Sequence, residues 1–303
     1  MPYVTLSSID PGELLGSAER RWRALEADRP DLKPAIDLQR ALISTVLDVA
    51  RAVDAVPLAQ LSPSYVAAKL ARGVSAFTGE PIPFPVGALR APLLKFCDAL
   101  AAGGASDSAR HIAAAIQRGD VDTGSLLAAS LGRNQTAIRQ GATHRGLAPD
   151  LLWLIAELAI SPFAHALQRS LFSAPDEVVA EALSNWNEGC CPACGSWPAL
   201  AEVVLGHRIL RCSFCAAGWE LRSYACIYCG ESGEAFVTAA PDQERKDRRV
   251  EVCGTCAGYL KTVDVAELSP FPLLAIADLE TMDLDVAAME RGYRRPALRT
   301  ASG

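Results

Sequence analysis

The sequence has no excess of basic residues. Its 303 residues include 29 Lys and Arg against 35 Asp and Glu, which gives a formal net charge of −6. Nucleic-acid-binding domains normally carry a basic patch or a basic excess, so this balance argues against a general nucleic-acid binder. Half of the residues are apolar and 21% are charged, a composition that supports a buried core and excludes a disordered chain.

The sequence also lacks a signal-peptide pattern and a long uninterrupted apolar run. Met1 leads directly into Pro2 with no basic segment before an apolar one. The most apolar stretch, 147–160, is interrupted by Pro149 and Glu157 and is short for a bilayer-spanning helix. We therefore expect a soluble, cytoplasmic protein without membrane insertion. Whether identical copies associate is left open.

The motifs of common enzyme classes are missing as well. There is no Walker loop, no GxGxxG after a strand, no GxSxG and no HExxH. A thioredoxin-type site would place a CxxC at the start of a helix within a strand–helix–strand unit, and no such unit is visible. The sequence therefore predicts a protein that is not an enzyme. No catalytic or organic-cofactor-binding residue is assigned.

Residues 1–187 show helical apolar spacing throughout. Leu38, Leu42 and Val46, for example, form a continuous stripe along one helical face. Sustained strand alternation is absent from this half. We predict a bundle of seven or eight helices, with a break near Pro162 because proline removes a helical hydrogen bond.

The pattern changes near Asn187, where short apolar runs, glycines and aromatic residues replace the helical spacing. From residue 265 the chain is apolar but broken by prolines; we expect one short helix at 283–291 and a loose Arg-rich tail. The predicted fold class is a mainly α N-terminal domain followed by small β-rich tandem modules of the rubredoxin-like or zinc-ribbon type. The expected domains are the helical domain 1–187, the metal modules 188–223 and 224–265, and the C-terminal extension 266–303.

Cysteine is concentrated in this second part. Nine of the ten cysteines lie between Cys190 and Cys256. Eight of them form four CxxC pairs: Cys191/Cys194, Cys212/Cys215, Cys226/Cys229 and Cys253/Cys256. In a chain that looks cytoplasmic, four such pairs are typical of two four-thiolate metal sites rather than of disulfides.

Sequential pairing requires the shortest loops. It groups Cys191, Cys194, Cys212 and Cys215 in site 1, and Cys226, Cys229, Cys253 and Cys256 in site 2. Each intervening loop of 17 or 23 residues holds one hairpin, so the closure entropy is low. We favour this grouping, with an interleaved cross-brace as the alternative. Tetrahedral sulfur sites suit zinc and a single iron alike, and the ligand type alone favours zinc.

The remaining cysteines and the histidines are not assigned to a metal. Cys190 is interpreted as a bystander beside Cys191, with ligand replacement or thiol exchange as the alternative. Cys97 lies in an apolar helical segment and is expected to be a small buried residue. His207 lies between two knuckles, but four cysteines already complete the first site.

A family resemblance rests on the ordered motifs around these cysteines. They are Cys191-Pro-Ala-Cys194-Gly-Ser-Trp-Pro198, Gly206-His-Arg-Ile-Leu-Arg-Cys212-Ser-Phe-Cys215, Trp219-Glu220, Arg222, Cys226-Ile-Tyr-Cys229 and Cys253-Gly-Thr-Cys256-Ala-Gly-Tyr-Leu-Lys261. This set resembles the formate dehydrogenase accessory protein FdhE family. The specific likeness covers about residues 188–264, and the helical half fits the family in length and character.

The resemblance implies a cytoplasmic maturation factor that binds the catalytic subunit of formate dehydrogenase and supports its assembly or activation. It also implies that the eight paired cysteines hold two metal ions in rubredoxin-like centres, and it favours iron over zinc. Two other functions remain open. One is an iron electron-transfer protein acting on that enzyme. The other is a zinc-ribbon nucleic-acid-associated protein, which the 12 basic against 15 acidic residues in 190–303 disfavour.

Overall fold

The computed structural model describes residues 3–4, 11–54, 58, 60–240 and 245–298. Its contacts divide the chain into two compact units. The helical unit comprises 9–60 and 77–170, and the sheet unit comprises 1–8, 61–76 and 171–303. This division differs from the expected boundary at residue 187, because three segments of the predicted helical domain (1–8, 61–76 and 171–187) belong with the sheet.

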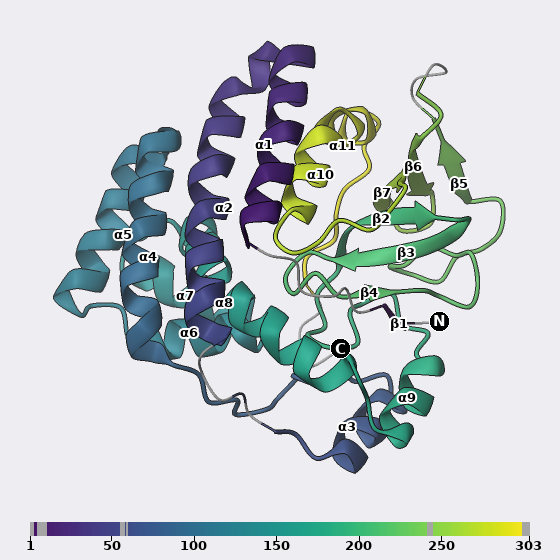
Figure 1. Ribbon diagram of the computed structural model, residues 1–303, viewed down its shortest axis with the longest axis horizontal. Helices are drawn as coiled ribbons and strands as arrows, with labels where there is room; N and C mark the ends of the chain where they lie inside the picture. Colours follow the sequence, from purple (N-terminus) through teal and green to yellow (C-terminus); the bar gives the residue numbers. More distant parts are fainter. Residues whose placement is uncertain (1–2, 5–10, 55–57, 59, 241–244, 299–303) are drawn as a thin grey trace. The chain divides into compact units, whose positions relative to one another are not determined.

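The helical unit consists of helices that follow the predicted apolar spacing (Figure 1). They are α1 (Pro11–Asp28), α2 (Lys33–Asp54), α4 (Val86–Leu100), α5 (Ser106–Arg118), α6 (Thr123–Leu131), α7 (Gln135–His144) and most of α8 (Pro149–Phe172), with short turns at Pro30–Leu32 and Ala101–Ala105. Side-chain caps begin α6 and α7: Asp122 accepts from the Ser125 amide at 2.7 Å, and Asn134 accepts from the Ala137 amide at 3.0 Å. Together with α3 (Pro63–Leu70) and α9 (Glu177–Ser184) of the sheet unit, the described part of 1–187 holds nine α-helices, against the seven or eight expected.

Helix α8 continues through Pro162, so the predicted break is wrong. Proline cannot donate to the carbonyl of Leu158, but the Ser161 hydroxyl donates to that oxygen at 3.4 Å. Phe163 beside it is fully buried, and this packing holds the helix together. The 24-residue helix is long and apolar enough to cross a membrane, so the shortness of 147–160 is no argument against a span. However, 56% of its most apolar window is buried within the protein, as in the core helix of a soluble protein.

The sheet unit contains one seven-stranded sheet in the order β1-β4-β3-β2-β7-β6-β5 (Figure 1). Its strands are β1 (Tyr3–Val4), β2 (Pro198–Val204), β3 (His207–Cys212), β4 (Gly218–Trp219), β5 (Phe236–Ala239), β6 (Arg248–Cys253) and β7 (Tyr259–Asp264). Helices α3 (Pro63–Leu70) and α9 (Glu177–Ser184) pack on each other in the same unit. The predicted combination of a helical N-terminal region and a β-rich C-terminal part is confirmed.

Two similar antiparallel modules make up this sheet. Strands β2, β3 and β4 form one, and strands β5, β6 and β7 form the other. Parallel pairing of β2 with β7, in which Ala201 lies opposite Thr262, joins the two modules. The modules are therefore parts of a single sheet and not two separate sheets. Strand β1, which the sequence did not predict, pairs with β4 through Tyr3 and Trp219.

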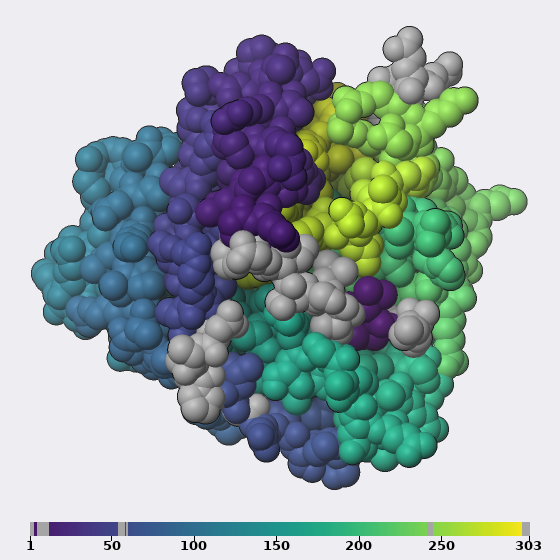
Figure 2. Space-filling view, in the orientation of Figure 1, coloured from purple at the N-terminus to yellow at the C-terminus, as the bar shows by residue number. Residues whose placement is uncertain are grey.

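Two C-terminal helices cover the sheet. Helix α10 (Leu274–Glu280) packs Leu274 against Leu200, and α11 (Met282–Met289) packs Leu284 against Val250 and its neighbours. In the space-filling view, the yellow atoms of these helices border the green atoms of the sheet (Figure 2). The expected helix at 283–291 thus corresponds to α11, whereas α10 was not predicted because it follows Pro270 and Pro272 closely.

A fully buried ion pair connects β2 to β3. Glu202 and Arg211 have side chains with 0% exposure and are hydrogen-bonded to each other. Glu202 also accepts from the Ser269 amide at 3.1 Å, and Arg211 donates to the carbonyls of Ser269 at 2.7 Å and Ala216 at 3.2 Å. Because both charges are neutralised and hydrogen-bonded, the pair holds the β2–β3 hairpin and the segment after Cys215 in one arrangement.

Replacing Glu202 by Gln should destabilise the sheet unit strongly. The substitution leaves the buried Arg211 guanidinium without a counter-charge, which typically costs about 3–5 kcal/mol. Asp264→Asn is the matched control, because it breaks the exposed Asp264–Arg249 pair on the same sheet and should cost about 1 kcal/mol or less. Denaturant unfolding followed by circular dichroism measures both, and equal stability of the two variants would contradict the role assigned to Glu202.

Candidate metal centres

The four CxxC knuckles share one backbone geometry. In each, the amide of the first cysteine donates to the carbonyl five residues later: Cys191 to Ser196 at 2.9 Å, Cys212 to Ala217 at 2.9 Å, Cys226 to Glu231 at 2.8 Å and Cys253 to Gly258 at 2.9 Å. This bond closes a tight loop, and both cysteine side chains of the pair project from it. A repeated local structure therefore presents the sulfurs at all four positions.

The residue after the second cysteine of each knuckle has a left-handed backbone. These residues are Gly195, Ala216, Gly230 and Ala257, with φ of 81°, 56°, 78° and 54°. Glycine adopts this conformation without steric cost, whereas alanine loses roughly 1–2 kcal/mol there. The two alanines keep the conformation because the surrounding structure requires the turn, and such strain is common next to functional sites.

The sulfurs of the first centre converge in the sheet unit. Those of Cys191, Cys194, Cys212 and Cys215 all lie within 4.8 Å of one another. The distance from Cys191 Sγ to Cys215 Sγ is 3.7 Å, and that from Cys194 Sγ to Cys212 Sγ is 3.4 Å. A disulfide needs about 2.05 Å. Metal–sulfur bonds of about 2.3 Å give tetrahedron edges of roughly 3.8 Å, so the spacing fits a four-sulfur metal site.

Residues from distant parts of the sequence enclose this first centre. The Ser75 hydroxyl donates to the Cys191 carbonyl at 2.7 Å, and the Ala76 amide donates to the Pro192 carbonyl at 2.9 Å. Tyr3 of β1 is buried, and its pKa is raised by that burial and by the nearby thiols. Burial likewise raises the pKa of Cys191, so a metal ion must displace protons from these thiols when it binds.

The second centre has the same sulfur geometry in a more open setting. Cys226, Cys229, Cys253 and Cys256 also lie within 4.8 Å of one another. The distances from Cys226 Sγ to Cys256 Sγ and from Cys229 Sγ to Cys253 Sγ are both 3.6 Å. Burial opposes ionisation of Cys253, but hydrogen bonds from the amides of Cys256 and Thr255 lower its pKa to about 7. Cys229 is exposed.

Direct packing links the two centres. The Trp197 and Tyr228 rings meet edge to face with centroids 5.0 Å apart, and Tyr228 lies within the third knuckle. A Cβ on Gly189 would lie 1.8 Å from the carbonyl oxygen of Ile227, so this approach requires glycine. The segment before the first knuckle is therefore packed tightly against the third.

The C-terminal segment crosses the fourth knuckle. The Arg294 amide donates to the Ala257 carbonyl at 2.8 Å, and the Trp197 indole donates to the Ala297 carbonyl at 2.9 Å. Arg295 binds Asp285 at 2.9 Å and Asp278 at 3.2 Å. The expectation of a loose Arg-rich tail is thus wrong for the described residues up to 298, because hydrogen bonds and the ion pairs of Arg295 hold this segment in place.

The other residues considered from the sequence lie outside both sulfur groups. Cys190 is buried, and its carbonyl accepts from the Trp186 indole at 3.1 Å. His207 is exposed and lies 3.2 Å from a carboxylate oxygen of Glu220. Cys97 is buried in α4, and burial raises its pKa to about 11, which makes it an unreactive core residue.

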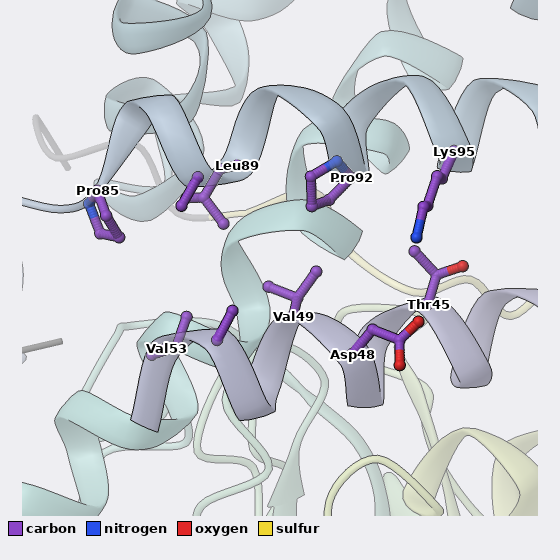
Figure 3. Close-up of a pocket in the computed structure, with 10 residues that line it drawn as sticks. Thr45, Asp48, Val49, Val53, Pro85, Leu89, Pro92 and Lys95 are labelled. Atoms are coloured by element: carbon purple, nitrogen blue, oxygen red, sulfur yellow. The ribbon is translucent and has the colours of Figure 1, made fainter. Parts of the chain in front are cut away.

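The helical unit also contains a small cavity. It occupies about 170 Å³ between α2 and α4 and is lined mainly by aliphatic side chains and prolines (Figure 3). The Thr45 hydroxyl donates to the Ala41 carbonyl, and Asp48 accepts from Arg51 at 2.8 Å. The Lys95 side chain of α4 points toward these two residues (Figure 3). Because Thr45 and Asp48 already bond within their own helix and the rest of the lining is apolar, the cavity offers a poor set of groups for chemistry. The sulfur clusters remain the candidate functional site.

Cysteine labelling tests the grouping of the knuckles. Under sequential grouping, changing Cys191 and Cys194 to Ser abolishes the first centre, so Cys212 should become alkylatable while Cys226 and Cys253 stay protected. An interleaved grouping exposes Cys226 instead of Cys212. Mass spectrometry of iodoacetamide-labelled peptides distinguishes these outcomes, and Cys97→Ser serves as the control that leaves both centres intact.

Comparisons with known proteins point to one family. No family model matches the sequence. Curated relatives named "Protein FdhE homolog" include those of Aquifex aeolicus (30% identity, 42% of this chain and 46% of the relative), Haemophilus influenzae strain PittEE (33%, 36% and 36%) and Pseudomonas aeruginosa (34%, 37% and 40%). The matched part thus spans less than half the length of these relatives.

A solved structure extends the likeness to the whole fold. The crystal structure of the FdhE protein from Pseudomonas aeruginosa matches with a TM-score of 0.60 over 98% of this chain and 97% of that chain, at 23% identity. Together with the sequence matches, this confirms the resemblance to the FdhE family.

Proposed function

Because this chain resembles the FdhE family in its cysteine motifs and in its fold, we propose that it is a cytoplasmic accessory protein for formate dehydrogenase. In this proposal it binds the catalytic subunit and supports its assembly or activation. It does so with two tetrathiolate metal centres built into the sheet unit, and it is not itself an enzyme. The ligands are Cys191, Cys194, Cys212 and Cys215 in one centre and Cys226, Cys229, Cys253 and Cys256 in the other.

The convergence of four sulfurs at each centre is the observation that carries this proposal. Four cysteines complete a tetrahedron and leave no position for a water molecule or a substrate, which hydrolytic metal sites require. Such a closed centre can hold the protein in shape or transfer an electron. Both properties suit a protein that acts on another enzyme rather than on a small molecule.

The metal supplies structure in either case and redox chemistry only if it is iron. Zinc has one stable oxidation state, whereas a single iron in four thiolates can cycle between two. The family resemblance favours iron, with zinc as the alternative. Iron would also support a second function, one-electron transfer to the client enzyme. The exposure of residue Cys229 favours this possibility because it offers electrons a short path to a partner.

A gene deletion and a binding assay test the proposal together. A strain without this gene should still make the formate dehydrogenase polypeptide, but formate oxidation should be lost because the enzyme is not matured. The tagged chain should capture the catalytic subunit, and changing Cys191 and Cys194 to Ser should weaken that capture. Cys97→Ser, a substitution of a buried cysteine outside both centres, should leave it unchanged.

Two results together would contradict the accessory role. One is full formate dehydrogenase activity in the deletion strain. The other is failure of the intact protein to capture the catalytic subunit under both oxidising and reducing conditions.

A further inference from the structure

The two centres differ in how exposed their cysteine residues are. All four cysteines of the first centre are buried, with residue exposures of 0–2%. In the second centre Cys226 and Cys253 are buried, whereas Cys229 is exposed and Cys256 is half-buried. The knuckle geometry is the same in both, so the difference comes from what lies around the knuckles.

Chain segments far apart in the sequence close the first centre. Strand β1 pairs with β4 beside it, and Ser75 and Ala76 bond to the first knuckle from the segment after α3. The Trp219 indole donates a hydrogen bond of 3.2 Å to the carbonyl of Glu188, which lies three residues before the first knuckle. Metal release from this centre therefore requires several tertiary contacts to open.

Among the residues that the structure describes, none forms a comparable cover over Cys229 of the second centre. Residues 229–230, 232–235 and 254–255, which flank its two knuckles, are exposed. Glu231 connects the knuckles on this side: its carboxylate accepts from the Thr255 hydroxyl at 3.2 Å and from the Gly233 amide at 2.6 Å. The C-terminal segment crosses the backbone at Ala257 but leaves Cys229 exposed.

We propose that the second centre is the exchangeable one and that the first is a permanent structural centre. Exchange begins at Cys229, where an external ligand can reach the metal and break the metal–sulfur bond without unfolding. As the ion leaves as a complex with that ligand, the freed sulfurs take up protons from solvent. Glu231 slows this step because it holds the third and fourth knuckles together.

This inference rests on the metal binding that the proposed function assumes, but its test does not involve formate dehydrogenase. Purified protein that holds two zinc ions is mixed with an excess of the chromogenic chelator 4-(2-pyridylazo)resorcinol, and zinc transfer is followed by absorbance. We expect two phases of equal amplitude, each of one zinc per chain. Iodoacetamide added during the fast phase should label Cys226, Cys229, Cys253 and Cys256 only.

A conservative variant tests, in a folded protein, whether Glu231 holds the third and fourth knuckles together. Hydrogen bonds that hold metal-ligating segments in place typically change metal affinity by about 10–100-fold. Glu231→Gln should therefore accelerate the fast phase by about tenfold and leave the slow phase unchanged. Glu234→Gln, an exposed position on the same loop, is the control and should change neither phase.

Other outcomes would overturn the assignment. A single phase that releases both ions, or early labelling of Cys191 and Cys212, would show that the first centre is not the protected one. Equal rates of the fast phase in Glu231→Gln and the parent protein would show that Glu231 does not slow metal release from the second centre. A protein that matures no formate dehydrogenase but still shows two phases would contradict the proposed function and leave this inference standing.

Discussion

Four sulfurs within 4.8 Å of one another cannot all carry negative charge unless a cation lies between them. This constraint applies at both centres. At each of them the local structure brings the four sulfurs to one point where a cation can bind. The knuckle turns, each closed by a cysteine amide and a carbonyl five residues later, direct the sulfurs to one point. The left-handed residues that follow, including Ala216 and Ala257, are strained conformations that persist because the knuckles need them.

The two centres share one sheet and contact each other directly. Parallel pairing of β2 with β7 joins the modules, and the Trp197–Tyr228 contact and the close approach of Gly189 to Ile227 link the knuckles directly. The buried Glu202–Arg211 pair holds the carbonyl of Ala216, so it supports the first centre from within the sheet. The two centres differ in the exposure of Cys229, and we therefore assign metal exchange to the second centre.

The sequence predicted the features whose signals are local. The CxxC spacing and the short loops between pairs identified the two sulfur groups and the hairpins between them, and apolar spacing identified the helical half. The features it missed depend on distant partners. Strand β1 has two residues and no periodicity, and β2–β7 pairing joins strands about sixty residues apart. The order of the C-terminal segment follows from its contacts with Ala257 and Trp197, which no local pattern reveals.

The central claim is that both sulfur groups hold a metal ion in the native protein. Anaerobic purification followed by elemental analysis and an electronic spectrum tests it most directly. The account predicts two metal ions per chain. Iron would add a thiolate-to-iron absorption that bleaches reversibly on reduction, and zinc would leave the protein colourless. A natively folded chain with fewer than two metal ions, and with all eight paired cysteines open to alkylation, would contradict the account.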